Sequence, residues 1–327
     1  MKHMLVTGGA GYIGSVLCKL LLQKGNRVTV ADNLMYGGEP IVELLNDPAF
    51  TFFKCDIRDQ DQMKTVFESA RFDAILHLAA IVGDPACARQ PELTRATNLD
   101  ASIALYTLAE QYGVGRFIFS STCSNYGKMK DPSVFVTEGS ELAPVSLYAE
   151  TKVAFEKYLL SQPVSNRCKP VCLRFSTVYG LSPRPRFDLT VNEFSKELAL
   201  GRELVIFGEQ FWRPYCHVVD LARAVILCAE APEEKVAFEV YNVGDTSENY
   251  TKKMIVSEIE KQLEGCQVKY IQKNEDPRDY RVNFDKIRER LGFGITINVP
   301  QGIAQTIKAV KDGFFANPDD PKYKNVN

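Results

Sequence analysis

The stretch that most constrains the fold is residues 4–32, which predicts a strand, a glycine-rich turn, a helix and a second strand. Its first three residues are apolar, as in a buried parallel strand. Glycines follow at positions 8, 11 and 14, and apolar residues then recur at helical spacing. A second strand-like segment, residues 27–31, leads to Asp32. This order predicts a βαβ unit with its glycines in the first strand-to-helix turn.

Such a turn is suited to binding a dinucleotide. A backbone without Cβ atoms lets a pyrophosphate approach the positive end of the following helix. Asp32 lies 18 residues after Gly14, close to the ~20 expected for a carboxylate that accepts hydrogen bonds from an adenosine ribose. Because this carboxylate would repel a 2′-phosphate, the unit predicts NAD rather than NADP.

Beyond Asp32, apolar strand-like segments alternate with helical ones, which predicts an α/β fold: a Rossmann-type, doubly wound parallel sheet. Ligands bind such sheets at the carboxyl ends of the strands. The expected strands cover 50–55, 73–78, 116–120 and 170–175, and the expected helices cover 60–70, a long segment after Pro91, and 147–161.

The pattern changes near Gly180, and we expect a smaller mixed α/β lobe that binds the substrate. We predict an irregular basic loop at 182–186, an aromatic loop at 211–215 and a polar, mobile tail at 317–327. The predicted helices and strands of this half are 189–200, 205–208, 217–229, 238–243 and 267–271. The expected domains are 1–180 with 215–248 for the cofactor, and 181–214 with 249–327 for the substrate.

Composition excludes several classes of function. The net charge of −2 gives no electrostatic reason to bind nucleic acid or an anionic membrane. No apolar run approaches the ~20 residues of a membrane span, and the first strand starts too near Met1 for a signal peptide. The nine scattered cysteines favour a reducing, cytoplasmic setting, and the three histidines lack metal-ligand spacing.

Tyr148 and Lys152 are four residues apart, adjacent on one face of a predicted helix. Ionising a free tyrosine at pH 7 costs ~4 kcal/mol, and a neighbouring ammonium together with an oxidised nicotinamide would lower that cost. Tyr148 would then take the proton of a substrate hydroxyl as its carbon loses hydride. A hydroxyl at Ser121, Thr122 or Ser124 would bind the same substrate oxygen. The alternative is a solvated Tyr–Lys helix face without a catalytic role.

An ordered set of motifs resembles the extended short-chain dehydrogenase/reductase family, in its group of nucleotide-sugar epimerases and dehydratases. The resemblance covers nearly the whole chain. It implies a tightly held NAD that oxidises a hydroxyl, usually at C4, of a sugar carried on a nucleoside diphosphate, and a homodimer packed through helices near 100–112 and 148–160. The motifs are residues 7–14 (TGGAGYIG), 56–59 (DIRD), 77–80 (HLAA), 120–127 (SSTCSNYG), Tyr148-x3-Lys152, 174–180 (RFSTVYG) and 213–220 (RPYCHVVD).

The resemblance also implies individual roles. Thr122, Tyr148 and Lys152 fall on the catalytic positions. The expected cofactor contacts are Gly8, Gly11, Tyr12, Ile13, Gly14, Asp32, Asn33, Asp56, Ile57, Leu78, Ala79, Ala80, Asn98, Ser120, Tyr148, Lys152 and Val178. The expected substrate contacts are Asp84, Thr122, Cys123, Ser124, Thr177, Asn192, Arg213 and Arg278. Thr177 stands where many members have Asn, and Asp84 has the alternative role of capping a helix.

One departure narrows the chemistry. The 4,6-dehydratases of this family carry Asp-Glu directly after the threonine, where this chain has Cys123-Ser124. A serine cannot replace a carboxylate as a base near pH 7, and Cys123 is either an acid–base group of lowered pKa or a small packed residue. We therefore expect a 4-epimerase or a C4 dehydrogenase. The alternatives are a 4-keto-reductase acting on a nucleotide sugar and a non-catalytic NAD-binding regulator.

Overall fold

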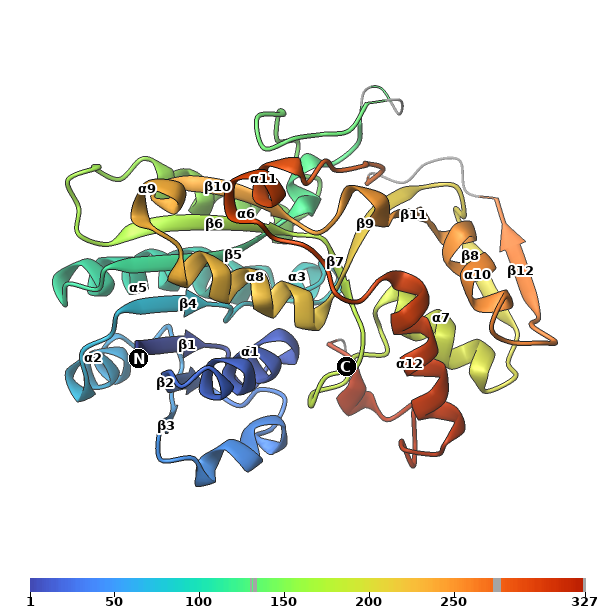
Figure 1. Ribbon diagram of the computed structural model, residues 1–327, viewed down its shortest axis with the longest axis horizontal. Coiled ribbons are helices and arrows are strands. Elements are labelled where there is room, and N and C mark those ends of the chain that lie inside the picture. Colours follow the sequence, from blue (N-terminus) through green and yellow to red (C-terminus); the bar gives the residue numbers. More distant parts are fainter. Residues whose placement is uncertain (130, 132–133, 273–277, 326–327) are drawn as a thin grey trace.

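The core of the protein is a seven-stranded sheet whose strands are all parallel (Figure 1). The computed structural model describes all residues except 130, 132–133, 273–277 and 326–327. The strand order is β3-β2-β1-β4-β5-β6-β10, so the order reverses between β1 and β4, where ligands of such sheets bind. The strands are β1 His3–Thr7, β2 Arg27–Asp32, β3 Phe50–Lys54, β4 Ala74–His77, β5 Arg116–Thr122, β6 Lys169–Phe175 and β10 Glu239–Val243.

Helices cover both faces of this sheet, because alternate residues of each strand point to opposite sides. Val6 and Leu76 pack in one apolar cluster with α1 (Tyr12–Gln23) and α8 (Val218–Glu230). Leu5 and Ile75 pack in a second cluster with helices of the other face, which are α2 Gln60–Ser69, α5 Ala101–Gln111 and α6 Leu147–Leu160. The predicted doubly wound α/β fold is confirmed.

A smaller lobe lies beside the carboxyl edge of the sheet (Figure 1). It has a mixed three-stranded sheet of order β11-β9-β7 and a parallel pair of β12 with β8. Its elements are β7 Thr177–Tyr179, α7 Thr190–Ala199, β8 Leu204–Phe207, β9 Trp212–His217, β11 Asn249–Thr251, α10 Lys252–Glu260, β12 Val268–Ile271 and α12 Val299–Lys311. The domain boundaries given above stay a prediction.

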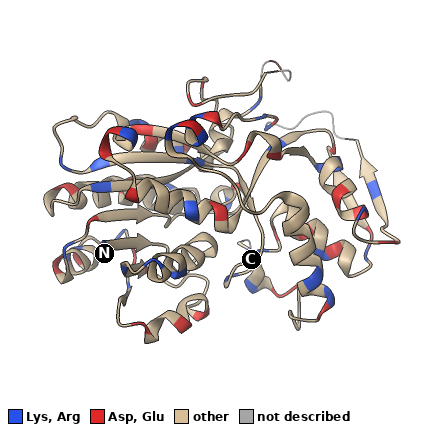
Figure 2. Ribbon diagram, viewed as in Figure 1, with Lys and Arg blue, Asp and Glu red and all other residues tan. Residues whose placement is uncertain are grey.

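The remaining helices are short. They are α3 Asp84–Arg89, α4 Pro91–Arg95, α9 Glu233–Val236 and α11 Asp285–Leu291, with 3-10 turns at Glu39–Asn46, Cys123–Tyr126, Thr246–Glu248 and Pro321–Tyr323. The long helix expected after Pro91 is formed by α4, a π-helical turn at Ala96–Asp100, and α5. No helix in the described part of the chain is long and apolar enough to cross a membrane. Lys and Arg are interspersed with Asp and Glu over both lobes (Figure 2).

Two expectations for the second half are wrong. The aromatic loop predicted at 211–215 is largely strand β9, because Trp212–Pro214 pairs with Asn249–Thr251 and 215–217 pairs with β7. The tail was expected to be mobile, but the described residues up to Asn325 fold back onto the lobe. Residues 326 and 327 lie outside the described residues. Both errors have one cause. The residues that contact these segments lie far away in the sequence, so the composition of each segment does not reveal them.

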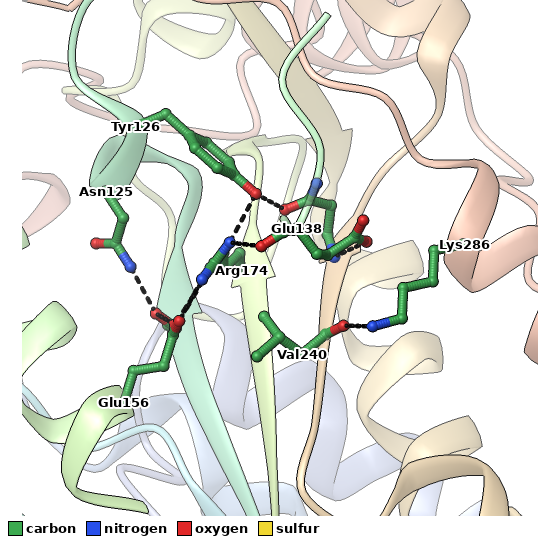
Figure 3. Close-up of polar contacts among 9 residues, drawn as sticks. Asn125, Tyr126, Glu138, Glu156, Arg174, Val240 and Lys286 are labelled. Carbon is green, nitrogen blue, oxygen red and sulfur yellow. Dashed lines mark hydrogen bonds and ion pairs between the residues drawn. The ribbon is translucent and has the colours of Figure 1, made fainter. Parts of the chain in front are cut away.

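A buried ion pair fixes α6 against the sheet (Figure 3). The guanidinium of Arg174, on β6, pairs with the carboxylate of Glu156, on α6, and both side chains are almost fully buried. Ser121 of β5 donates a hydrogen bond to the same carboxylate at 2.8 Å. Tyr126 accepts a hydrogen bond from Arg174 at 2.9 Å and donates one to Asn242 of β10 at 2.7 Å. This network ties α6 to three neighbouring strands.

We expect Glu156→Ala to destabilise the protein by about 3–5 kcal/mol, because it leaves a buried guanidinium without its counter-ion. The matched control is Glu43→Ala, which removes a carboxylate from the exposed Lys19–Glu43 pair and should cost at most about 1 kcal/mol. Urea unfolding followed by circular dichroism measures both. Equal unfolding midpoints for the two variants would contradict a positioning role for the pair.

Candidate active site

A cleft runs along the carboxyl edge of the large sheet, where its strands meet the smaller lobe. All of the predicted cofactor residues line it except Asn98. Asn98 lies behind the cleft wall, where its amide accepts a hydrogen bond from the Ile81 backbone N–H at 2.8 Å and donates one to the Ile81 carbonyl at 2.9 Å. It therefore fixes the loop that follows β4.

The glycine turn fits a pyrophosphate. Gly8 has φ +77°, and a Cβ there would lie 2.7 Å from the Ala79 backbone nitrogen. A Cβ at Gly14 would lie 2.1 Å from the Gly8 carbonyl oxygen. No described side chain caps the N-terminus of α1. Its first N–H groups are therefore available to an anion, as a dinucleotide site requires.

Asp32 and Asp56 lie at two neighbouring strand ends of the cleft. The Asp32 carboxylate accepts backbone hydrogen bonds from Ala10 at 3.0 Å and Leu34 at 2.8 Å, which link β2 to the glycine turn. Burial raises the pKa of Asp32, and these two N–H groups oppose that shift. Hydrogen bonds from Arg58 lower the pKa of Asp56 to about 2. Both carboxyl groups suit adenosine recognition by their placement.

Tyr148 and Lys152 project from α6 into the same cleft. Lys152 Nζ donates a hydrogen bond to the Ser120 carbonyl at 2.8 Å and lies 4.8 Å from the Phe119 ring centroid and 5.8 Å from that of Tyr148. Burial lowers the pKa of Lys152 to about 7. Burial also raises the pKa of Tyr148, and a hydrogen bond with Thr122 opposes this shift. The three predicted catalytic side chains therefore meet at one point.

Of the predicted substrate residues, Thr122 alone is in the cleft lining of the described structure. The Cys123 thiol is buried and donates to the Arg174 carbonyl at 3.2 Å, and burial raises its pKa. Asn192 is buried, and its amide binds the Gly180 N–H at 2.8 Å and the Arg186 carbonyl at 2.9 Å. These positions favour packing for Cys123 and loop support for Asn192.

The other substrate candidates lie on the side of the smaller lobe. Asp84 and Arg278 form an ion pair at 2.8 Å. The Arg213 guanidinium lies 5.4 Å from the Tyr280 ring centroid, and the Tyr280 hydroxyl lies 3.4 Å from Ser124 Oγ. Thr177 pairs with Tyr215 in the small sheet. Substrate contacts at these residues stay a prediction.

The cleft lining also has residues that were not among the predicted site residues, and these include Tyr36, Arg184, Arg186 and Asn325. The two arginines belong to the basic loop that follows β7, and the rule that ligands meet strand ends would have identified them. Tyr36 follows β2 in the same way. Asn325 carries no sequence signal, because its tail reaches the cleft only through the tertiary fold.

A glycine turn at a helix N-terminus, a carboxylate at the next strand end and a Tyr–Lys pair whose lysine is buried define a dinucleotide-dependent enzyme that moves hydride to or from an alcohol carbon. No described group of His, Cys, Asp or Glu residues could hold a metal ion. Residues 4–244 match the model of the NAD dependent epimerase/dehydratase family. The chain belongs to this family.

Proteins with similar sequences and structures include several epimerases. The chain is 33% identical to the UDP-glucose 4-epimerase of Lacticaseibacillus casei over 254 residues, which are 73% of this chain and 75% of the relative. The structure resembles UDP-glucose 4-epimerase of Thermotoga maritima solved with UDP-glucose, with a TM-score of 0.84, 30% identity, and coverage of 96% of this chain and 100% of the other. It also resembles UDP-glucuronic acid 4-epimerase of Bacillus cereus, solved with UDP-glucuronic acid and NAD, with a TM-score of 0.83, 25% identity and coverage of 95% and 99%.

These comparisons confirm the predicted family, the NAD cofactor and an enzyme that acts on nucleotide sugars. They do not test the individual site residues, which rest on the geometry of the cleft.

We expect Asp32→Asn to weaken NAD binding by about 10-fold or more, because a charge-assisted hydrogen bond contributes ~1.5–3 kcal/mol. The loss of the carboxylate should also reduce the ratio of the affinities for NAD and NADP, since the charge that repels the 2′-phosphate is gone. Fluorescence titration with NADH and NADPH measures both effects. An unchanged ratio of the two affinities would contradict the assignment of Asp32 to the adenosine ribose.

Proposed function

We propose that the protein is a 4-epimerase of a UDP-linked sugar. The observation that carries this proposal is the meeting of Thr122, Tyr148 and Lys152 in the cleft that also holds the glycine turn. The relatives named above support UDP as the carrier and C4 as the reacting carbon. The same support leads us to propose a homodimer packed through α5 and α6. A cytoplasmic location is favoured by the nine cysteines, all of which are free thiols.

The chain's own residues would act on the C4 hydroxyl. NAD supplies the hydride acceptor and, once reduced, the hydride donor. Thr122 orients the hydroxyl, and Tyr148 takes its proton as the C4 hydrogen leaves, giving a 4-keto sugar. Lys152 is held by the Ser120 carbonyl. When this lysine is protonated, its charge stabilises the Tyr148 phenolate. Rotation of the keto sugar and return of hydride to the opposite face, with Tyr148 giving back the proton, complete the epimerisation.

Four other functions are less well supported. A 4,6-dehydration needs a carboxyl acid and base after Thr122, and the Cys123 thiol is turned to the Arg174 carbonyl instead. A one-way C4 dehydrogenase or a 4-keto-reductase would use the same three residues but would exchange its cofactor in every cycle. A non-catalytic regulator would have no need for a buried lysine beside Tyr148.

The purified protein should interconvert a UDP-hexose and its C4 epimer without net formation of NADH. Chromatography of the sugar nucleotides and absorbance at the NADH band measure the two quantities together. Stoichiometric NADH would favour the one-way dehydrogenase. If no member of a broad nucleotide-sugar panel reacts while NAD stays bound, the result favours a non-catalytic NAD-binding regulator.

We expect Tyr148→Phe to lower turnover by about 10²–10⁴-fold while NAD binding is retained, since the variant lacks only the hydroxyl that moves the proton. Tyr158→Phe is the matched control, because it is the same change on the same helix at a residue outside the cleft lining. Turnover with several UDP-hexoses and NAD content after gel filtration measure the effect. Near-normal turnover of Tyr148→Phe would rule out this mechanism.

A further inference from the structure

The described part of the C-terminal tail follows α12 (Figure 1) and returns to the cofactor cleft, where its last described residue, Asn325, is part of the lining. Asp319 anchors its start through ion pairs with Lys196 and Arg202, both at 2.7 Å. Tyr323 anchors its middle, where the carbonyl accepts the Phe187 N–H at 2.8 Å and the ring packs against that of Phe187 at 5.8 Å. The described residues of the tail are therefore packed against the rest of the protein.

The last described residue of the tail, Asn325, connects the tail to two loops at the cleft. The Asn325 backbone N–H donates to Asp188 at 3.1 Å, and its side-chain amide lies 3.4 Å from the Val82 carbonyl. Its side-chain oxygen accepts from the Arg184 guanidinium, which also donates to the Lys324 carbonyl at 3.2 Å. Asn325 thus bridges the loop after β4 and the basic loop after β7, and it fixes Arg184 between them.

Arg184 is buried to 96% and lines the cleft, yet its Nε has no hydrogen-bond partner among the described residues. Its guanidinium lies 4.0 Å from the Tyr36 ring centroid. Burial and the neighbouring Arg186 lower the pKa of Arg184 to about 10. A buried cation with an unsatisfied N–H is costly, and an anion in the cleft would remove that cost. Arg186 is different, because Asp188 already binds it at two points.

The position of Arg184 indicates which anion it meets. Two residues before it, Ser182 Oγ donates to the Tyr12 carbonyl at 2.6 Å and lies 3.2 Å from Ser15 Oγ. The basic loop is therefore attached to the first turn of α1, where the glycine turn leaves backbone N–H groups for a pyrophosphate. The arginines predicted to contact the substrate, Arg213 and Arg278, are outside the cleft lining.

We propose that Arg184 binds the pyrophosphate of NAD and that the C-terminal tail, through Asn325 and the Lys324 carbonyl, is a latch that holds Arg184 over the bound cofactor. Arg184 contacts the cofactor, and Asn325 is a positioning residue. The latch slows NAD release. Slow release suits an enzyme that regenerates its cofactor in every turnover, although the inference depends on the cofactor alone and not on the sugar substrate.

The test is the rate at which the protein releases NADH, followed by fluorescence after dilution into excess NAD, without any sugar nucleotide. Arg184→Gln should release NADH at least 10-fold faster than the unmodified protein. Asn325→Ala, a change in the tail that leaves the sheet untouched, should release it several-fold faster. Lys322→Ala, which removes a solvent-exposed tail cation paired with Asp320 at 3.5 Å, is the control and should leave the rate unchanged.

The double variant separates positioning from general loosening of the tail. If Asn325 acts through Arg184, adding Asn325→Ala to Arg184→Gln gives no further acceleration. If the two substitutions accelerate NADH release additively, Asn325 does not act through Arg184 and the proposed latch is wrong. Unchanged NADH release in both single variants would contradict the whole proposal. If Arg184→Gln also raised the KM for the sugar nucleotide, Arg184 would bind the substrate and not the cofactor. A failed epimerase assay leaves these release rates interpretable, so the two proposals fail separately.

Discussion

The buried contact between Arg174 and Glu156 is the interaction on which the geometry of the active site depends. Glu156 follows Lys152 by one helical turn, and Arg174 belongs to the strand next to β5. Their ion pair therefore sets how α6 lies across the end of β5. That placement brings Lys152 Nζ to the Ser120 carbonyl and Tyr148 to Thr122. Two buried charges are tolerated because Ser121, Tyr126 and the Glu138 carbonyl satisfy the remaining hydrogen-bonding groups.

The cleft joins parts of the chain that have different tasks. The glycine turn and the ends of β2 and β3 provide the groups that we assign to the adenosine half of a dinucleotide, and α6 provides the groups that we propose for moving a proton. The basic loop after β7 and the C-terminal tail close the side of the smaller lobe. Burial lowers the pKa of Lys152 and raises that of Tyr148. A bound ligand charge can therefore change the protonation of the site strongly.

Local patterns predicted much of this arrangement. Short-range rules located the glycine turn, the strand ends and the Tyr148–Lys152 pair, because each depends on residues within one βαβ unit or one helical turn. Trp212 shows where such rules fail: its segment is a strand only because Asn249–Thr251 pairs with it. Asn192 shows another limit, since its amide is used by the backbone of Gly180 and Arg186. Sequence spacing does not indicate which partner a buried amide will meet.

The sequence by itself determined the class of fold and the NAD cofactor, and it singled out the residues that we propose for the chemistry. These follow from periodicity, from glycines without Cβ atoms and from the spacing of a tyrosine and a lysine on one helix face. Only the tertiary structure decided that Cys123 is a packed thiol, that Asp84 pairs with Arg278, and that Asn325 reaches Arg184 at the cofactor cleft. The physical reason is distance along the chain, since these partners lie 51 or more positions apart and meet only after the chain has folded.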